Sequence, residues 1–184
     1  LEAILREWQK KPAVIGTVEN RFEKHRIEST HTTPDAIGLQ KLFSDFLKLG
    51  AQAVCMEVSS HALDQKRTVG TQFAAALFTN LTQDHLDYHQ TMENYFEAKS
   101  LFFTDYPVRV RAIHTADAYG KRLAEICREK NLKHLTFDSK DADIEYGSLS
   151  FDLSGIRGKI NGIPIQSALF GAFNIQNIAG VVAV

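Results

Sequence analysis

The sequence lacks the features that mark several classes of protein. Two cysteines in 184 residues are too few for a disulfide framework and fit a reducing compartment, so we expect a cytoplasmic protein. No apolar run approaches the roughly 18 residues that a membrane span requires. Neither sign of charge dominates, because 21 basic and 22 acidic residues leave a net charge of −1. This balance argues against nucleic-acid binding.

Both ends of the sequence lack the marks of a complete chain. There is no initiator Met, and residues 1–9 carry acid where a signal peptide carries base. Residues 1–9 have the pattern of a helix end that Pro12 stops, and residues 173–184 have the pattern of a helix beginning. We therefore expect residues 1–184 to be a fragment of a longer protein.

Short apolar runs alternate with amphipathic segments along most of the chain. The expected strands lie at 13–18, 53–58, 73–79, 108–115 and 134–137. The expected helices lie at 34–49, 92–103 and 118–130. Strands that alternate with helices of this length predict an α/β fold with a mostly parallel sheet flanked by helices.

The first long helix has clear boundary signals. Thr33 is a favourable N-cap, Pro34 a favourable first helical residue, and Gly50 a favourable end. The face expected to be buried consists of apolar residues at helical spacing, namely Leu39, Leu42, Phe43, Phe46 and Leu47.

The pattern changes after Asp138. Leu149, Phe151 and Leu153 alternate with polar residues, as in a half-exposed strand, and Asn161-Gly162 is a strong hairpin signal. We expect residues 144–169 to form a small antiparallel β part attached to an edge or end of the main sheet.

Polar clusters follow two of the expected strands. One runs from Glu57 to His61 and the other from Asn80 to His89. Open parallel sheets bind ligands at the carboxyl ends of their strands, so two such clusters favour a binding site. The alternative is a pair of structural turns, because Ser, Asn and Asp also satisfy loop backbone groups.

Lys99 is unusual because helical spacing places it on an apolar stripe, four residues after Tyr95 and shortly before Phe102 and Phe103. One interpretation is that the stem covers apolar surface while the ammonium reaches water. The other is a desolvated amine with a lowered pKa. A neutral amine can add carbon dioxide and become a carbamate, an oxygen anion suited to Mg²⁺.

Two further groups have less specific patterns. His85 and His89 are four residues apart and would suit zinc on a helix, but the segment is expected to be a loop and lacks the Glu of H-E-x-x-H. Cys55 and Cys127 are expected to be inert core thiols.

Several of these stretches together resemble the Mur ligases, most closely the branch that adds the third residue of the peptidoglycan stem peptide. The stretches that carry the resemblance are Thr32-Thr33-Pro34-Asp35, Met56 to Leu63, Phe78 to Leu81, Asp84 to His89, Ala98-Lys99, and Gly171 with Phe173-Asn174 and Asn177. The resemblance implies the central, P-loop-type domain of a three-domain, ATP-dependent ligase.

The resemblance also implies a reaction and a set of residues. The D-glutamyl carboxylate of UDP-MurNAc-L-Ala-D-Glu becomes an acyl phosphate, which the amine of a diamino acid attacks. The implied catalytic and Mg²⁺-binding residues are Glu57, His85 and a carbamate of Lys99. The residues implied to bind the UDP-MurNAc-dipeptide are Thr32, Thr33, Ser59, Gln65 and Arg67. The residues implied to bind ATP are Asn80, Asn174 and Asn177.

One departure from the family is large, because its Gly-rich P-loop would precede Leu1 and is absent, as is the C-terminal domain that selects the amino acid. We therefore expect residues 1–184 alone to be inactive. Two alternatives stay open, a folylpolyglutamate-synthetase-like ligase of the same superfamily and a non-catalytic binding module. These residues do not distinguish meso-diaminopimelate from L-lysine as the incoming amino acid.

Overall fold

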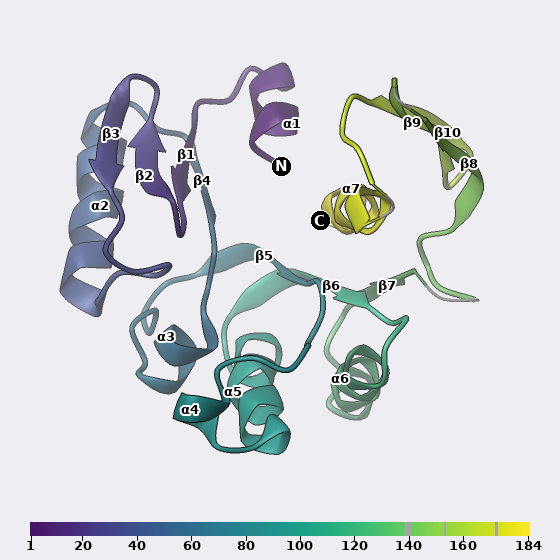
Figure 1. Ribbon diagram of the computed structural model, residues 1–184. Helices are drawn as coiled ribbons and strands as arrows, with labels where there is room; N and C mark the ends of the chain where they lie inside the picture. Colours follow the sequence, from purple (N-terminus) through teal and green to yellow (C-terminus); the bar gives the residue numbers. More distant parts are fainter. Residues whose placement is uncertain (139–140, 153, 172) are drawn as a thin grey trace. The chain divides into compact units, whose positions relative to one another are not determined.

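The computed structural model describes residues 1–138, 141–152, 154–171 and 173–184. The chain divides into two compact units, residues 1–71 and 72–184, and each is described by itself (Figure 1). Within the described residues, no helix combines the length and apolar character needed to cross a bilayer.

Unit 1 is a four-stranded mixed sheet with a long helix on it. The strands are β1 (Pro12–Ile15), β2 (Glu19–Phe22), β3 (His25–Glu28) and β4 (Ala53–Met56), in the order β3-β2-β1-β4. The helices are α1 (Glu2–Glu7), α2 (Ala36–Lys48) and α3 (Ser60–Asp64). The pair β1–β4 is parallel and the other two pairs are antiparallel.

Helix α2 connects β3 to β4, and its start differs from the prediction. The N-cap is Asp35, whose Oδ1 accepts hydrogen bonds from the N–H groups of Ile37 (3.0 Å) and Gly38 (2.9 Å). Thr33 is not the cap, because its hydroxyl is bonded elsewhere in the unit. Gly50 follows the helix with φ +97°, as predicted for its end.

The core of unit 1 forms where α2 meets the sheet. Leu39 and Phe46 of α2 are buried against residues of β1 and β2, namely Ala13, Ile15 and Phe22. Leu42 and Phe43 pack beside them. The prediction for Leu47 is wrong, because this side chain is 71% exposed. It follows Phe46 by one residue, and that step of 100° turns it away from the sheet.

The hairpin β2–β3 was not predicted. Phe22 pairs with His25, so the turn consists of Glu23 and Lys24, with Glu23 at φ +51°. Glu and Lys are not the Asn or Gly that usually mark such a turn, and the segment therefore has the pattern of a polar loop.

Unit 2 is built on a parallel three-stranded sheet with helices on both faces (Figure 1). The strands are β5 (Phe73–Phe78), β6 (Val108–His114) and β7 (Leu135–Phe137), in the order β5-β6-β7. Helices α5 (Met92–Thr104) and α6 (Ala118–Glu129) cover one face and α7 (Phe173–Ala183) the other. The short helix α4 (Leu86–His89) lies in the segment expected to be a loop.

The expected antiparallel strands form a sheet of their own. They are β8 (Tyr146–Asp152), β9 (Gly155–Ile160) and β10 (Ile163–Ser167), in the order β10-β9-β8. Asn161 (φ +48°) and Gly162 (φ +76°) form the predicted two-residue turn. Leu153, within the predicted range, lies outside the described residues.

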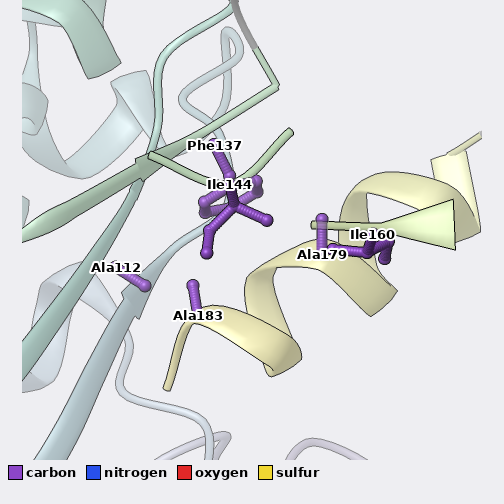
Figure 2. Packing of buried hydrophobic residues seen from close by; sticks show 6 residues of the cluster. All are labelled: Ala112, Phe137, Ile144, Ile160, Ala179 and Ala183. Atoms are coloured by element: carbon purple, nitrogen blue, oxygen red, sulfur yellow. The ribbon is translucent and has the colours of Figure 1, made fainter. Parts of the chain in front are cut away.

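Helix α7 joins the two sheets of unit 2. Ala179 and Ala183 of α7 are buried between the parallel sheet and the antiparallel one (Figure 2). The neighbours that complete this cluster are Ala112, Phe137, Ile144 and Ile160. Small residues on α7 allow close packing, since a Cβ on Gly180 would meet Leu77 at 2.8 Å. The α/β class with parallel strands and a small antiparallel part is therefore confirmed.

Candidate functional site

In unit 1 the predicted site begins where β1 and β4 end. These strands are parallel, so Gly16-Thr17 and Glu57 follow them at the same edge of the sheet. The Oε2 atom of Glu57 accepts two hydrogen bonds from Thr17, one from the hydroxyl (2.6 Å) and one from the backbone N–H (3.2 Å). A Cβ on Gly16 would stand 3.2 Å from the carboxylate, so glycine leaves it room.

Thr33 contacts the backbone that follows β4 and is fully buried. Its hydroxyl donates to the carbonyl oxygen of Glu57 (2.8 Å) and accepts from the N–H of Ser59 (3.0 Å). Thr33 therefore fixes the turn after β4 from both sides. Its neighbour Thr32 places its hydroxyl 3.1 Å from that of Thr17.

Ser59 and Arg67 lie at the two ends of the segment that holds α3. The Ser59 hydroxyl accepts from the N–H of Ala62 (3.2 Å) and caps the helix. The Arg67 guanidinium donates to Gln65 Oε1 through Nε (2.9 Å) and Nη2 (2.6 Å). Its Nη1 donates to the carbonyl oxygen of Thr33 (2.8 Å). We call these hydrogen-bonded residues the unit 1 cluster: Thr17, Thr32, Thr33, Glu57, Ser59, Gln65 and Arg67. Hydrogen bonds thus link the five residues predicted to bind the substrate to Glu57, directly or through one another and Thr17.

In unit 2 His85 and Lys99 are grouped around one aromatic ring. The ring of Tyr95 is stacked on His89 at 5.1 Å and meets His85 edge-on at 5.8 Å. Lys99 Nζ lies 5.5 Å from the centre of the same ring and 5.9 Å from that of Phe78. His85 itself is exposed and has φ +54°, a conformation that costs energy for a residue with a side chain.

Burial lowers the pKa of Lys99, and the charge of Asp84 partly opposes this effect. The amine is therefore more often neutral than that of a lysine in water, because a low-polarity environment disfavours the ammonium. This geometry supports the desolvated interpretation of Lys99 over one in which the ammonium extends freely into water.

A cavity of about 180 Å³ lies at the carboxyl ends of β5 and β7. It is lined by Thr79, Asn80, Phe137, Phe173, Gln176 and Asn177. Asn177 Nδ2 donates to Asn174 Oδ1 (3.2 Å), and Asn174 Nδ2 donates to the Phe170 carbonyl (2.7 Å). Two of the three residues predicted to bind ATP, Asn80 and Asn177, therefore line this cavity, and the third, Asn174, is hydrogen-bonded to Asn177. Phe137 and Gln176 had not been predicted, since neither carries a signal beyond its strand or helix.

The Glu57 carboxylate suits Mg²⁺. Glu57 is exposed and offers a carboxylate, the type of ligand that Mg²⁺ prefers. Across the described ranges no group of three His, Cys, Asp or Glu side chains is placed to hold a metal ion of any kind. Mg²⁺ keeps several waters and often binds substrate phosphates, so it needs few protein ligands.

The two cysteines have the environment of unreactive thiols. Cys127 is buried and Cys55 partly buried. Burial raises the pKa of both thiols, which keeps them protonated and poorly nucleophilic.

Comparison with known proteins agrees with this architecture. The family profile of the Mur ligase middle domain matches residues 1–184. A protein of Geobacter metallireducens named UDP-N-acetylmuramoyl-L-alanyl-D-glutamate--2,6-diaminopimelate ligase is 39% identical, with 100% of this chain and 38% of the relative covered. The Aquifex aeolicus protein of the same name gives the same identity and coverages.

A solved structure leads to the same family. A UDP-N-acetylmuramoyl-L-alanyl-D-glutamate--2,6-diaminopimelate ligase matches with a TM-score of 0.85 and 32% identity, covering 98% of this chain and 38% of the other. The chain thus spans well under half the length of the relatives it matches. Since the profile covers the whole chain and the fold and the sequence agree, the chain belongs to the Mur ligase family and corresponds to its middle domain.

Proposed function

We propose that the protein carrying this chain is an ATP-dependent ligase that joins 2,6-diaminopimelate to UDP-MurNAc-L-Ala-D-Glu in peptidoglycan synthesis, a cytoplasmic step. The relatives that are 39% identical over the whole chain bear the name of this reaction. The observation that carries the proposal is the hydrogen-bonded cluster of unit 1. Residues separated by up to 35 positions, from Thr32 to Arg67, are linked there by hydrogen bonds that also reach Glu57.

The chemistry has two steps. The D-glutamyl carboxylate attacks the γ-phosphorus of ATP, and ADP leaves with the electrons of the broken bond. The diamino acid's amine then attacks the acyl carbon, phosphate leaves and the amine loses a proton. Both steps depend on positioning and on neutralisation of phosphate charge more than on covalent groups of the protein.

The proposed roles of this chain's residues follow from their chemistry. Thr32, Ser59, Gln65 and Arg67 present hydroxyl, amide and guanidinium groups to the anionic nucleotide substrate, and Thr33 holds them in place. Glu57 of unit 1, and His85 and a carbamate of Lys99 in unit 2, would each serve as a ligand of Mg²⁺, which would supply charge neutralisation when bound. Asn80 and Asn177, with Asn174 beside Asn177, bind ATP at the cavity of unit 2, whose volume suits part of a ligand.

The test uses the complete protein that contains this chain. Phosphate release is measured with ATP, Mg²⁺ and UDP-MurNAc-L-Ala-D-Glu, and 2,6-diaminopimelate and L-lysine are compared as the incoming amine. We expect turnover that depends on the muramoyl substrate and is faster with 2,6-diaminopimelate. Turnover with folate and glutamate, in place of the muramoyl substrate and the diamino acid, would favour the folylpolyglutamate alternative. Absence of phosphate release with either pair of substrates would favour a binding module.

A further inference from the structure

Thr17 lies between Thr32 and Glu57 in unit 1, and the proposed function gives it no role. Its hydroxyl lies 2.6 Å from Glu57 Oε2 and 3.1 Å from the hydroxyl of Thr32. An ionised carboxylate only accepts hydrogen bonds, so the single hydroxyl proton of Thr17 goes to Glu57. The hydroxyl of Thr32 is then the donor to Thr17. The hydrogen bonds therefore run in one direction, from Thr32 through Thr17 to Glu57.

The same contacts fix the orientation of the Glu57 carboxylate. Both Thr17 donors, the N–H and the hydroxyl, bind one oxygen, Oε2. Gly16 also lies against the carboxylate, because a Cβ there would stand 3.2 Å from Oε1 and Cδ and 3.5 Å from Oε2. An exposed glutamate loses side-chain entropy when it is ordered, and these contacts compensate for that loss before a ligand arrives.

We propose that Thr17 is a positioning residue that orients Glu57 for a divalent cation and Thr32 for the nucleotide substrate. The inference rests on the proposed function, because it takes Glu57 as a cation ligand and Thr32 as a substrate contact. Groups that hydrogen-bond a metal ligand are worth about 10- to 100-fold in metal affinity or activity. Since Thr17→Val keeps the backbone N–H bond, we expect an effect at the lower end of this range.

Unit 2 offers a matched control for the chemistry of Thr17. Thr136 also donates its N–H (2.8 Å) and its hydroxyl (2.7 Å) to one carboxylate oxygen, Oδ2 of Asp143. Neither residue belongs to a candidate site. Thr136→Val therefore removes the same kind of hydrogen bond and should change stability without changing cation binding.

The experiment measures Mn²⁺ binding to the complete protein, by the electron paramagnetic resonance signal of the free ion. We expect about a tenfold weaker Mn²⁺ affinity in Thr17→Val, an unchanged affinity in Thr17→Ser, which keeps the hydroxyl, and an unchanged affinity in Thr136→Val. Thr17→Ala is the second variant, in case the valine protein does not fold. In activity assays the KM for the muramoyl substrate should rise in Thr17→Val and recover in Thr17→Ser.

Three results would overturn the proposal. They are an unchanged Mn²⁺ affinity in Thr17→Val or Thr17→Ala, an equal loss in Thr136→Val, and no Mn²⁺ binding by the unaltered protein. The Mn²⁺ measurement is independent of turnover. If the unaltered protein binds Mn²⁺ with the expected variant pattern but ligates no muramoyl substrate, the proposed reaction fails and the role of Thr17 at the cation stands.

Discussion

The candidate substrate-binding residues of unit 1 and the candidate metal-binding residues of unit 2, His85 and Lys99, are held in place by different kinds of contact. In unit 1, the side chains of Thr33, Ser59 and Arg67 make hydrogen bonds to backbone groups. In unit 2, His85 and Lys99 are arranged around the ring of Tyr95, and the described residues give the Lys99 amine no hydrogen bond or ion pair.

This difference separates two kinds of functional residue. A side chain that satisfies buried backbone groups contributes to folding as well as to binding, so its loss lowers both. A side chain held over an aromatic ring contributes little to the fold, because a desolvated amine is itself costly to bury. We therefore expect substitutions in unit 1 to lower stability and affinity together, and substitutions at Lys99 to lower activity alone.

The largest effect is expected for Lys99→Ala in the complete protein. A carbamate at this position would supply negative charge to the bound metal, and loss of one such electrostatic group costs on the order of 10²-fold or more in kcat. The melting temperature should stay the same or rise, because a partly desolvated amine is removed. Steady-state kinetics and thermal unfolding measure both effects.

Two controls sharpen the Lys99 result. Lys121→Ala removes an exposed lysine of α6 and should leave kcat unchanged. Short-chain carboxylates added to Lys99→Ala should restore part of the lost rate, since they replace the oxygen ligands of a carbamate. Full activity of Lys99→Ala would contradict the carbamate and would mean that the stem of Lys99 only covers apolar surface.

Thr33→Val should give the largest loss of stability. Valine has the same shape but leaves the carbonyl of Glu57 and the N–H of Ser59 without the partner that they share. An unsatisfied buried group costs about 1–3 kcal/mol. At roughly 2–4 °C per kcal/mol for a chain of this size, the melting temperature should fall by several degrees.

Thr33→Ser keeps the hydroxyl and should keep most of the stability. The pair of variants also tests the implied contact between Thr33 and the substrate. A raised KM in Thr33→Val at an unchanged melting temperature would mean that the hydroxyl serves the substrate, and our assignment to the fold would be wrong.

Arg67→Lys should lower stability and weaken substrate binding together, each by a smaller amount. Lysine can keep one of the hydrogen bonds that the guanidinium makes to Thr33 and Gln65, but it lacks the planar fork. We expect a loss of about 1 kcal/mol and a higher KM for the nucleotide substrate. Arg128→Lys, which alters an exposed pair with Glu125, is the control. A raised KM without loss of stability would place Arg67 with the residues that serve binding only.

Much of the fold could be predicted because periodicity and capping are local properties. The strands around Val14, Val54 and Val110 and the turn at Asn161-Gly162 follow from β-branched runs and turn chemistry. The hairpin at Glu23-Lys24 could not be predicted, because tertiary pairing overrides the local polar pattern there. The sequence predicts the N-cap of α2 at Thr33, two residues before the observed cap Asp35. The difference arises because Thr33 makes a long-range hydrogen bond to Glu57 instead.

The candidate site could be predicted only as a set of residues. Its motifs point to Glu57, Ser59 and Arg67 as candidates. Local spacing does not reveal that each of these residues makes a hydrogen bond with Thr33. Thr17 carries no motif in the sequence, and its position against Glu57 depends on the parallel pairing of β1 with β4. Tertiary contact decides such roles, so residue type and spacing alone miss them.

The smallest effect concerns the pH dependence of stability at Asp35, which caps α2 beside the unit 1 cluster. The N–H of Gly38 is the main cause of a lowered pKa for this carboxyl, and the charge of Arg67 adds to it. Because the pKa in the folded state lies below that in the unfolded state, Asp35 stabilises the fold fully above the unfolded pKa of about 3.9. That contribution is lost as the pH falls through the lower, folded pKa.

Asp35→Asn keeps an N-cap of similar strength but removes the charge. The melting temperature of the variant should therefore lie slightly below that of the unaltered protein at pH 7, and the two should converge as the pH falls below about 4. Thermal unfolding at a series of pH values measures the difference. In Arg67→Lys the difference should stay nearly the same, because lysine keeps the positive charge near Asp35. A difference in melting temperature between Asp35→Asn and the unaltered protein that does not change with pH would mean that hydrogen bonding alone, and not the charge of Asp35, stabilises the start of α2.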